Sequence, residues 1–460
     1  MIEMVEEILT TIPDYKEFLT VEEMDENTLR LAEEYPDIVK VKIAGHSRNG
    51  HPIYLLTIGS GKYDAMLYGC PHPNEPIGAM MLEFLSNELA TNDDLRISSD
   101  YTWHIIKCID VDGTKLNEGW FKGELTLTRY ARDFFRPAAY EQVEWTYPFE
   151  YKDYKFDSPL PETKILMNLI DEIKPDFVYG LHNAGFGGTY WYINNELPDL
   201  WEDFYKASSR QGLPLHLGEP EVSFIKPYAP AIFPFISSKD TYDHYEKYGD
   251  ESPAQMMANS GGSTESYIAD SGLNSYFLVT ELPYFYDERI DSEKEMNITR
   301  KESILSGIEI SQTVSSLIGE KMDVIDSCIS DENPFYKMVK QDQMYSKKGL
   351  SAEINYINDN EEYNQPCKES EYLDSNIIRR FYTLLSLSLA IRSCEYEIRK
   401  GNSNEIIKDV LKDLLDYFSI KAAECEELIN YNVIPIKKLI SVQLECGLLL
   451  MNKIRERVEK

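Results

Sequence analysis

The stretch YGCPHPNEPIGAMMLEFL, residues 68–85, leads from a short apolar run through a proline-rich turn into a segment with helical periodicity. His72 and Glu75 lie three residues apart in this turn, between Pro71 and Pro76. A divalent metal needs ligands that rigid backbone directs at one point, and the prolines supply that rigidity. The spacing alone is a weak signal, because a loop histidine followed by a glutamate at a helix start also occurs without a metal.

Extended and helical patterns alternate over the first two thirds of the chain. A hairpin is predicted with its turn at Asn49–Gly50, where alternating apolar residues flank a turn sequence. The periodicity further predicts helices at 22–35, 76–92 and 161–176, and extended segments at 65–70, 100–113, 177–188 and 275–285. Strands that alternate with helices are typical of an α/β fold.

The pattern changes at about residue 326. Polar, irregular segments are followed by three stretches with apolar residues at three- and four-residue spacing, 376–400, 404–429 and 435–458. We therefore expect a catalytic domain at 1–325 and an all-α C-terminal domain at 326–460. These C-terminal helices could form a homo-oligomer, or they could wall off the active-site cleft.

Composition excludes several classes of partner. The net charge of −33 disfavours binding to nucleic acid and to anionic membranes. No apolar run approaches the ~18 residues of a membrane span. The seven cysteines are an odd number without a CxxC pair, and the N-terminus lacks the pattern of a signal peptide. We expect free thiols in a cytoplasmic protein.

Two distant residues complete a candidate metal site. His182 ends a predicted strand just before the glycines of GFGG, and α/β sheets place their sites at such strand ends. Glu281 ends another strand in VTELPYF, where a carboxylate is costly to bury unless it is paired in an ion pair or has a function. Two histidines and a glutamate with an open fourth position can hold catalytic zinc, and a second glutamate can act as general base.

At this point the sequence resembles the carboxypeptidase A-like zinc metallocarboxypeptidases. HPNE, a later single histidine and a still later glutamate occur in the family's order. DVDGTKLNEGWF resembles the family's NPDG turn, with Asp110 and Val111 in place of Asn and Pro, and NSGGSTESY resembles its ASGGS segment. The resemblance covers about residues 15–315. It implies a central mixed, twisted sheet flanked by helices.

The resemblance also implies a cofactor and roles for four residues. One Zn²⁺ per chain would be held by His72, Glu75 and His182. Glu281 would be the general base for a zinc-activated water and would then return the proton to the leaving amine.

Exopeptidase chemistry also needs cations, and RYARDFFRP supplies three arginines. By resemblance Arg132 would bind the terminal carboxylate, although Ala131 stands where the family has Asn. Spacing does not decide whether Arg129 or Arg136 polarises the scissile carbonyl. Arg136 is taken as the catalytic candidate and Arg129 as a substrate-binding one. A loop or surface ion pair is the alternative role for each of them.

The substrate pocket departs from the family pattern. Met257 stands where the family has a mobile capping tyrosine, and Tyr267 could replace that tyrosine, although packing is the simpler role for it. Thr264, followed by Glu265, falls at the family's specificity pocket. Because neither residue makes an apolar pocket, we expect no preference for large aromatic end groups.

Three functions are compatible with these residues. The first is a zinc metallocarboxypeptidase that hydrolyses the C-terminal amide bond of a peptide or a cell-wall-type peptide. The second is a zinc amidohydrolase that deacylates small N-acyl amino acids. The third is a catalytically silent zinc-binding protein that interacts through its helical domain.

Overall fold

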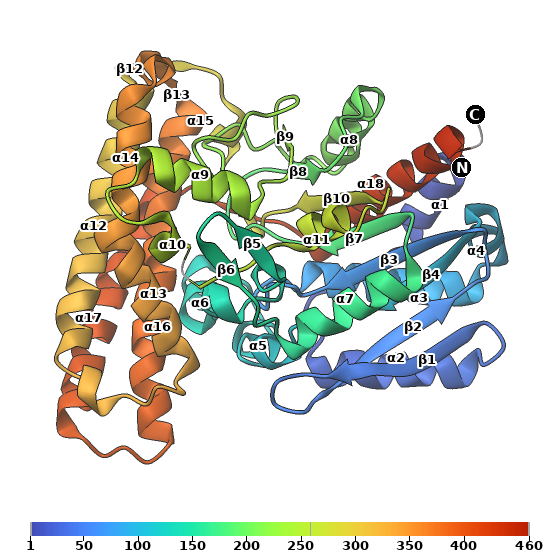
Figure 1. Ribbon diagram of the computed structural model, residues 1–460, viewed down its shortest axis with the longest axis horizontal. Helices are drawn as coiled ribbons and strands as arrows, with labels where there is room; N and C mark the ends of the chain where they lie inside the picture. The colour runs from blue at the N-terminus through green and yellow to red at the C-terminus, as the bar shows by residue number, and fades with distance from the viewer. Residues whose placement is uncertain (1, 258, 459–460) are drawn as a thin grey trace.

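The computed structural model describes residues 2–257 and 259–458. Met1, Ala258, Glu459 and Lys460, which belong to the two predicted domains, lie outside the described residues. An eight-stranded mixed sheet forms the centre of the fold (Figure 1). In spatial order its strands are β1 (Val39–His46), β2 (Pro52–Ile58), β4 (Tyr101–Ile106), β3 (Tyr63–Gly69), β7 (Phe177–Leu181), β10 (Tyr276–Glu281), β8 (Tyr190–Ile193) and β9 (Ile232–Phe233).

The four central strands, β4, β3, β7 and β10, run parallel to one another. The β1–β2 hairpin pairs antiparallel within itself and with β4, and β8 pairs antiparallel with β10 and parallel with β9, so the predicted mixed sheet is confirmed. The predicted hairpin turn is also confirmed, with Gly50 at φ 85°. Because all parallel strands end at the same edge, the residues that follow β3, β7 and β10 lie together there.

Helices cover both faces of the sheet. One face carries α3 (Ile77–Thr91), α8 (Pro198–Arg210) and α18 (Ile436–Val458), and the other carries α7 (Pro161–Ile173) and α11 (Thr264–Asp270) (Figure 1). Every residue of β7 is buried, as expected for a parallel strand with helices on both sides. The sequence sets the helix bounds locally, since α7 begins with Pro161 and ends at Lys174, which has φ 53°.

Smaller elements surround this core. They are the helices α1 (Ile2–Thr11), α2 (Val21–Glu34), α4 (Asp93–Ser99), α5 (Val111–Lys115), α6 (Leu127–Asp133), α9 (Ser238–Tyr248) and α10 (Pro253–Met256), and three two-stranded sheets, β5 (Phe149–Tyr151) with β6 (Tyr154–Phe156), β11 (Phe285–Tyr286) with β14 (Asn432–Val433), and β12 (Glu295–Thr299) with β13 (Pro366–Lys368).

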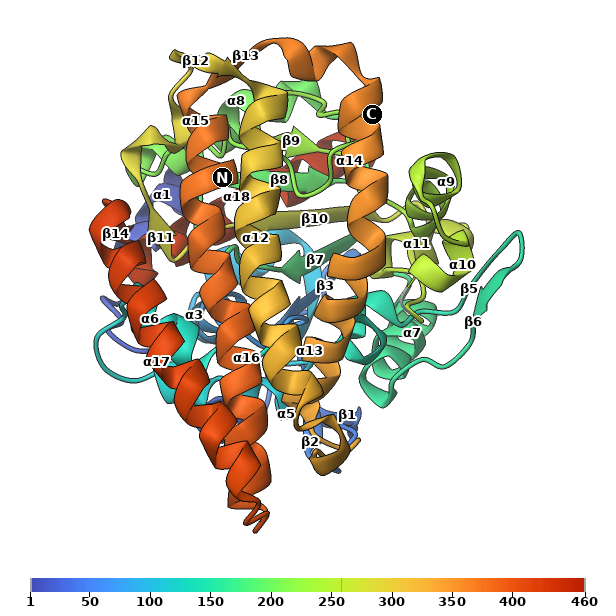
Figure 2. The ribbon, with the colours of Figure 1, turned by 90° about the vertical axis from the view of Figure 1, so that its left-hand side faces the viewer.

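A layer of helices stands across the edge where the parallel strands end (Figures 1 and 2). It contains α12 (Arg300–Asp323), α13 (Pro334–Met344), α14 (Leu350–Asp359), α15 (Glu369–Tyr372), α16 (Arg379–Arg399) and α17 (Glu405–Leu428). The layer therefore begins at Arg300, ahead of the boundary at 326. The serines and the glutamine of ISQTVSS interrupt the apolar periodicity of α12 and concealed this helix in the sequence. None of the described helices is both long and apolar enough to cross a bilayer.

The last helix, α18, leaves this layer and packs against the sheet. Its Gln443 is fully buried and donates a hydrogen bond of 2.9 Å from Nε2 to the backbone carbonyl of His182. The Tyr179 hydroxyl donates to the carbonyl of Gln443, also at 2.9 Å. Residues from α1 to α18 thus share one hydrophobic core, and α18 fixes the end of β7.

We predict that Gln443→Ala destabilises the fold by about 1–3 kcal/mol, because it leaves the buried His182 carbonyl without its donor. Chemical denaturation of the full chain measures the change. Asn452→Ala is the control, because among the described residues the Asn452 amide bonds only to Glu456 on the same helix. Equal stability of the two variants would contradict a supporting role for Gln443.

Candidate metal centre

The turn between β3 and α3 is held in one conformation by its neighbours. Glu75 N donates to His72 O at 3.1 Å, and the Tyr284 hydroxyl donates to Asn74 O at 2.9 Å. Gly113, in the turn that resembles NPDG, packs so closely on Pro73 that an added Cβ would lie 2.8 Å from it. These contacts explain how a short loop can present two side chains rigidly at the edge of the sheet.

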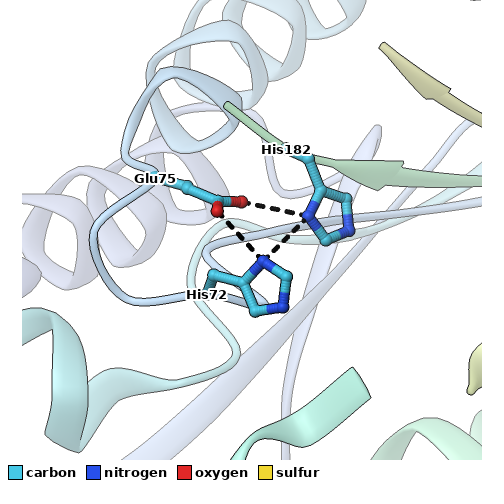
Figure 3. Close-up of side chains that lie close together, drawn as sticks. All are labelled: His72, Glu75 and His182. Carbon is cyan, nitrogen blue, oxygen red and sulfur yellow. Dashed lines mark hydrogen bonds and ion pairs between the residues drawn. The ribbon is translucent and has the colours of Figure 1, made fainter. Parts of the chain in front are cut away.

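His72, Glu75 and His182 converge at this edge (Figure 3). The Glu75 carboxylate lies 3.0 Å from His72 Nδ1 through Oε1 and 3.0 Å from His182 Nδ1 through Oε2. The two Nδ1 atoms are 3.1 Å apart, and all three side chains are buried. The three residues that the sequence singled out as metal ligands therefore lie together, although 107 residues separate Glu75 from His182.

These donor atoms fit a zinc ion. Ligand bonds of 2.0–2.1 Å in tetrahedral geometry place neighbouring ligand atoms about 3.3 Å apart, close to the separations here. Both imidazole Nδ1–H groups donate to the Glu75 carboxylate. Neither proton is then left to form a hydrogen bond in the short contact between the two Nδ1 atoms. A cation at their common centre removes both Nδ1 protons and satisfies all three side chains.

Asn183 joins the three segments that carry the site. Its backbone N–H donates to Glu75 Oε2 at 3.2 Å, and its side-chain Oδ1 accepts from Ile77 N at 3.2 Å. Its Nδ2 donates to the carbonyl of Leu282, the residue after Glu281, at 3.1 Å. One buried side chain thereby fixes the ends of β3, β7 and β10 relative to one another. The sequence analysis missed Asn183, although it directly follows His182.

Burial and neighbouring charges shift the acid–base equilibria of the site. Burial, followed by the nearby charge of Arg136, lowers the pKa of His72 to about 3, so its imidazole is neutral and able to bind a metal. Burial acts to raise the pKa of Glu75, but His72 and His182 outweigh it and hold this carboxylate ionised. Burial, and then the charges of Glu75 and Glu221, raise the pKa of Glu281 well above its usual range.

Glu281 lies beside the metal ligands. Its Oε1 is 4.0 Å from His182 Nδ1, and its buried Oε2 has no hydrogen-bond partner among the described residues. A carboxylate oxygen that is buried without a partner next to a metal centre is available to a water or a substrate.

The three arginines of RYARDFFRP have different surroundings. Arg136 Nη1 donates to Glu75 Oε1 at 3.2 Å, which puts this guanidinium against the metal ligands. Arg132 forms an ion pair with Glu395 of α16, and Arg129 binds the backbone carbonyls of Gly119 and Glu124. Of the three, Arg136 alone lines the cavity described below.

The predicted pocket residues lie behind the cavity surface. Thr264 is fully buried, and its hydroxyl donates to Glu144 Oε2 at 3.0 Å, so it holds a carboxylate that does line the cavity. Met257 packs in a small aromatic cluster. The Tyr267 hydroxyl donates to Asp171 at 2.9 Å, away from the metal ligands.

A cavity of about 760 Å³ contains the metal ligands, Glu281 and Arg136. Its opposite wall consists of side chains from α12, α13, α14 and α16, among them Asp342, Arg379 and Tyr382. The helical layer in Figure 2 therefore forms one wall of the site. Sequence reasoning missed these residues, because no local motif links the amphipathic helices to a ligand site 200 residues earlier.

We predict that Asn183→Ala lowers zinc affinity by about 10- to 100-fold, because Glu75 and the strand ends lose a common anchor. Titration with a competing chelator measures the affinity. His104→Ala is the control, since His104 pairs with Asp64 outside the site. Unchanged zinc affinity in Asn183→Ala would show that the ligands hold their geometry without this residue.

Comparison with known proteins shows which solved structures resemble this chain. The solved structures that match include carboxypeptidase A from Helicoverpa armigera, at 16% identity over 62% of this chain and 71% of that chain, with a TM-score of 0.37. A metallopeptidase from Shewanella baltica matches at 13% identity over 59% and 90%, with a TM-score of 0.39. Bovine thrombin-activatable fibrinolysis inhibitor matches at 15% identity over 57% and 86%, with a TM-score of 0.33.

None of the curated proteins matches the chain significantly in sequence. The family model for zinc carboxypeptidases matches residues 24–284, more than half of the chain, and this range contains the three metal-binding candidates and Glu281. The helical layer lies beyond the matched range. The chain therefore belongs to the zinc carboxypeptidase family, a family of metallopeptidase hydrolases whose cofactor is a zinc ion.

Proposed function

We propose that the protein hydrolyses the C-terminal amide bond of a short peptide or a cell-wall-type peptide, with Glu281 as general base. The observation that carries this proposal is the position of Glu281, with one oxygen 4.0 Å from a zinc-binding candidate and the other without a partner in the same cavity. A cation bound by His72, Glu75 and His182 would lower the raised pKa of Glu281 again, so that its carboxylate can accept a proton from an attacking water and return it to the leaving amine.

Zinc bound by His72, Glu75 and His182 would supply Lewis-acid activation of water and of the substrate carbonyl. The chain supplies the remaining groups. Arg136 is our candidate for polarising the scissile carbonyl, because its guanidinium lies against Glu75 at the centre of the site.

The terminal carboxylate of the substrate needs a cation as its partner. Arg132 would have to exchange Glu395 for the substrate in order to serve. Arg379 of α16 lines the cavity, and its only hydrogen bond among the described residues runs from Nε to the carbonyl of Ser375 at 3.2 Å. Its Nη groups are thus available for a carboxylate, and we propose Arg379 as the cation that binds it.

The same chemistry supports deacylation of small N-acyl amino acids, since the enclosed cavity admits small substrates of either kind. Substrates separate the two activities: the peptidase cleaves free peptides, and the deacylase cleaves only N-acyl amino acids. A chain that binds zinc and cleaves neither class would be a silent member of the family.

The cellular location and the self-association of the enzyme are also part of the proposal. We place it in the cytoplasm, because the seven cysteines are all free thiols and six of them are buried. Self-association through the C-terminal helices stays a prediction, to which the exposed Ile406, Ile420 and Leu428 of α17 contribute apolar surface.

We predict that Glu281→Gln lowers kcat by about 100- to 10,000-fold and leaves about one zinc per chain, because the amide keeps the shape of the side chain but cannot accept the proton. Hydrolysis of a peptide panel and metal analysis test both parts. Glu288→Gln, an exposed change seven residues later, is the control and should keep full activity. Retention of hydrolysis by Glu281→Gln would refute the proposed base.

Arg379→Gln should raise KM for peptides about 10- to 100-fold with a smaller effect on kcat, because a charge-assisted contact with the carboxylate is lost. Arg132→Gln is the matched comparison and should change KM less than about threefold, as expected for a partly exposed ion pair. Steady-state kinetics measure both variants. A larger increase in KM for Arg132→Gln than for Arg379→Gln would show that Arg132 binds the terminal carboxylate of the substrate.

A further inference from the structure

The helical wall of the cavity carries a group of polar side chains. Beside the apolar Val314, Ile318, Val339 and Leu385, the helices α12, α13 and α16 present Ser311, Gln312, Ser315, Asp342, Gln343 and Ser386 to the cavity. A polar surface directed at a cavity that also holds a catalytic metal site is expected where a polar ligand binds.

Asp342 is an acidic group in this wall without an ion pair among the described residues. Its only hydrogen bond among the described residues comes from the Ser386 hydroxyl at 3.2 Å. A carboxylate has room for about four such contacts. Burial raises the pKa of Asp342 to about 6, so the group is still ionised at neutral pH. Asp342 is half-buried, and a partly desolvated charge without an ionic partner is costly unless function requires it.

The position of Asp342 relative to the metal site is fixed by two contacts of α13. The neighbouring residue Gln341 accepts from Ala139 N at 2.6 Å, and Lys337 pairs with Glu141 at 2.6 Å. These partners follow Arg136 closely in the sequence, so α13 is attached to the loop that carries the arginine beside Glu75. Asp342 thus faces the cavity from the Arg136 side.

Arg379 marks the other end of the wall. It precedes Ser386 by seven residues on α16, which corresponds to about 10 Å along the helix axis. Ser386 bonds to Asp342, whereas Arg379 extends toward the carbonyl of Ser375, so the acidic and the basic group lie toward opposite ends of this wall. A short zwitterionic peptide likewise carries a positive charge at one end and a negative charge at the other.

We propose that Asp342 binds a cationic group of the substrate within the helical wall, and that the enzyme thereby selects short peptides with a free α-amino group. This inference rests on the proposed function, since it takes the ligand of the cavity to be a peptide. A lysine or arginine side chain offers the same ammonium or guanidinium chemistry and is the alternative source of the charge.

Binding to the inactive Glu281→Gln variant tests the proposal without turnover. Isothermal titration compares Ala-Ala-Ala, N-acetyl-Ala-Ala-Ala and N-acetyl-Lys-Ala-Ala. We expect the free tripeptide to bind about 10- to 100-fold more tightly than its acetylated form. Adding Asp342→Asn should abolish this difference, and adding the exposed Asp331→Asn should preserve it.

The outcomes separate the sources of the charge. If the acetylated lysine peptide binds as tightly as the free tripeptide and loses affinity in Asp342→Asn, the site accepts side-chain cations as well. If Asp342→Asn binds all three peptides as the parent does, the proposal is overturned. Hydrolysis by the wild type is scored separately. If the protein distinguishes the free from the acetylated tripeptide but hydrolyses no peptide, the proposed function alone is refuted. If it hydrolyses peptides but does not distinguish the two, this inference alone is refuted.

Thermal stability distinguishes a ligand-binding role from a structural one. The pKa of Asp342 is about 6 in the folded chain, above its ordinary value of 3.8, so the cost of its charge is absent below about pH 4 and complete above about pH 6. Asp342→Asn should therefore raise Tm at pH 8 and change it little at pH 4. A lower Tm at pH 8 would show that Asp342 supports the fold, and the proposal would fail.

Discussion

The fold of this protein is organised around one carboxylate, that of Glu75, which lies between two imidazoles and a backbone amide. One imidazole comes from His72, and the other imidazole and the amide come from the adjacent residues His182 and Asn183. Asn183 also links the three strand ends, and Gln443 donates a hydrogen bond to the carbonyl of His182. Small errors in the sheet would separate donor atoms that now lie about 3 Å apart. The parallel register of β3 and β7 is therefore a functional as well as a structural constraint.

The helical layer changes what such a site can accept. In the family range the sheet edge provides Glu281 and the residues that could hold a metal ion, and the loop after α6 provides Arg136. The helices beyond that range provide the facing wall. Hydrogen bonds connect the helical layer to the family domain. Ser388 of α16 donates to the carbonyl of Arg132, and Arg392 donates to the carbonyls of Asp133 and Phe134. Arg132 takes part in the same junction through Glu395. An arginine at a motif position has here become part of the contact between the two layers.

Sequence reasoning reached the sheet and the convergence of His72, Glu75 and His182 because their signals are local. The alternation of apolar residues around Asn49–Gly50 specifies a hairpin, and a histidine or glutamate just after a buried strand marks the edge where parallel strands end. It did not predict features that depend on how distant segments of the chain pack against one another. Whether Arg132 faces a ligand or Glu395 depends on where α16 packs, and no local signal in the sequence shows that serines of α12 line a cavity. Polar positions in an amphipathic helix do not say whether they meet bulk water or an enclosed ligand.

The placement of α18 has a consequence for biosynthesis. The helix is the last described element of the chain, and yet it supplies the buried amide that holds the backbone of His182. A ribosome-bound chain that has emerged only as far as α17 lacks that donor and part of the core beneath the sheet. The backbone of His182 thus gains its side-chain donor only after translation has passed residue 443, so the edge of the sheet that carries the candidate metal site is completed late in synthesis.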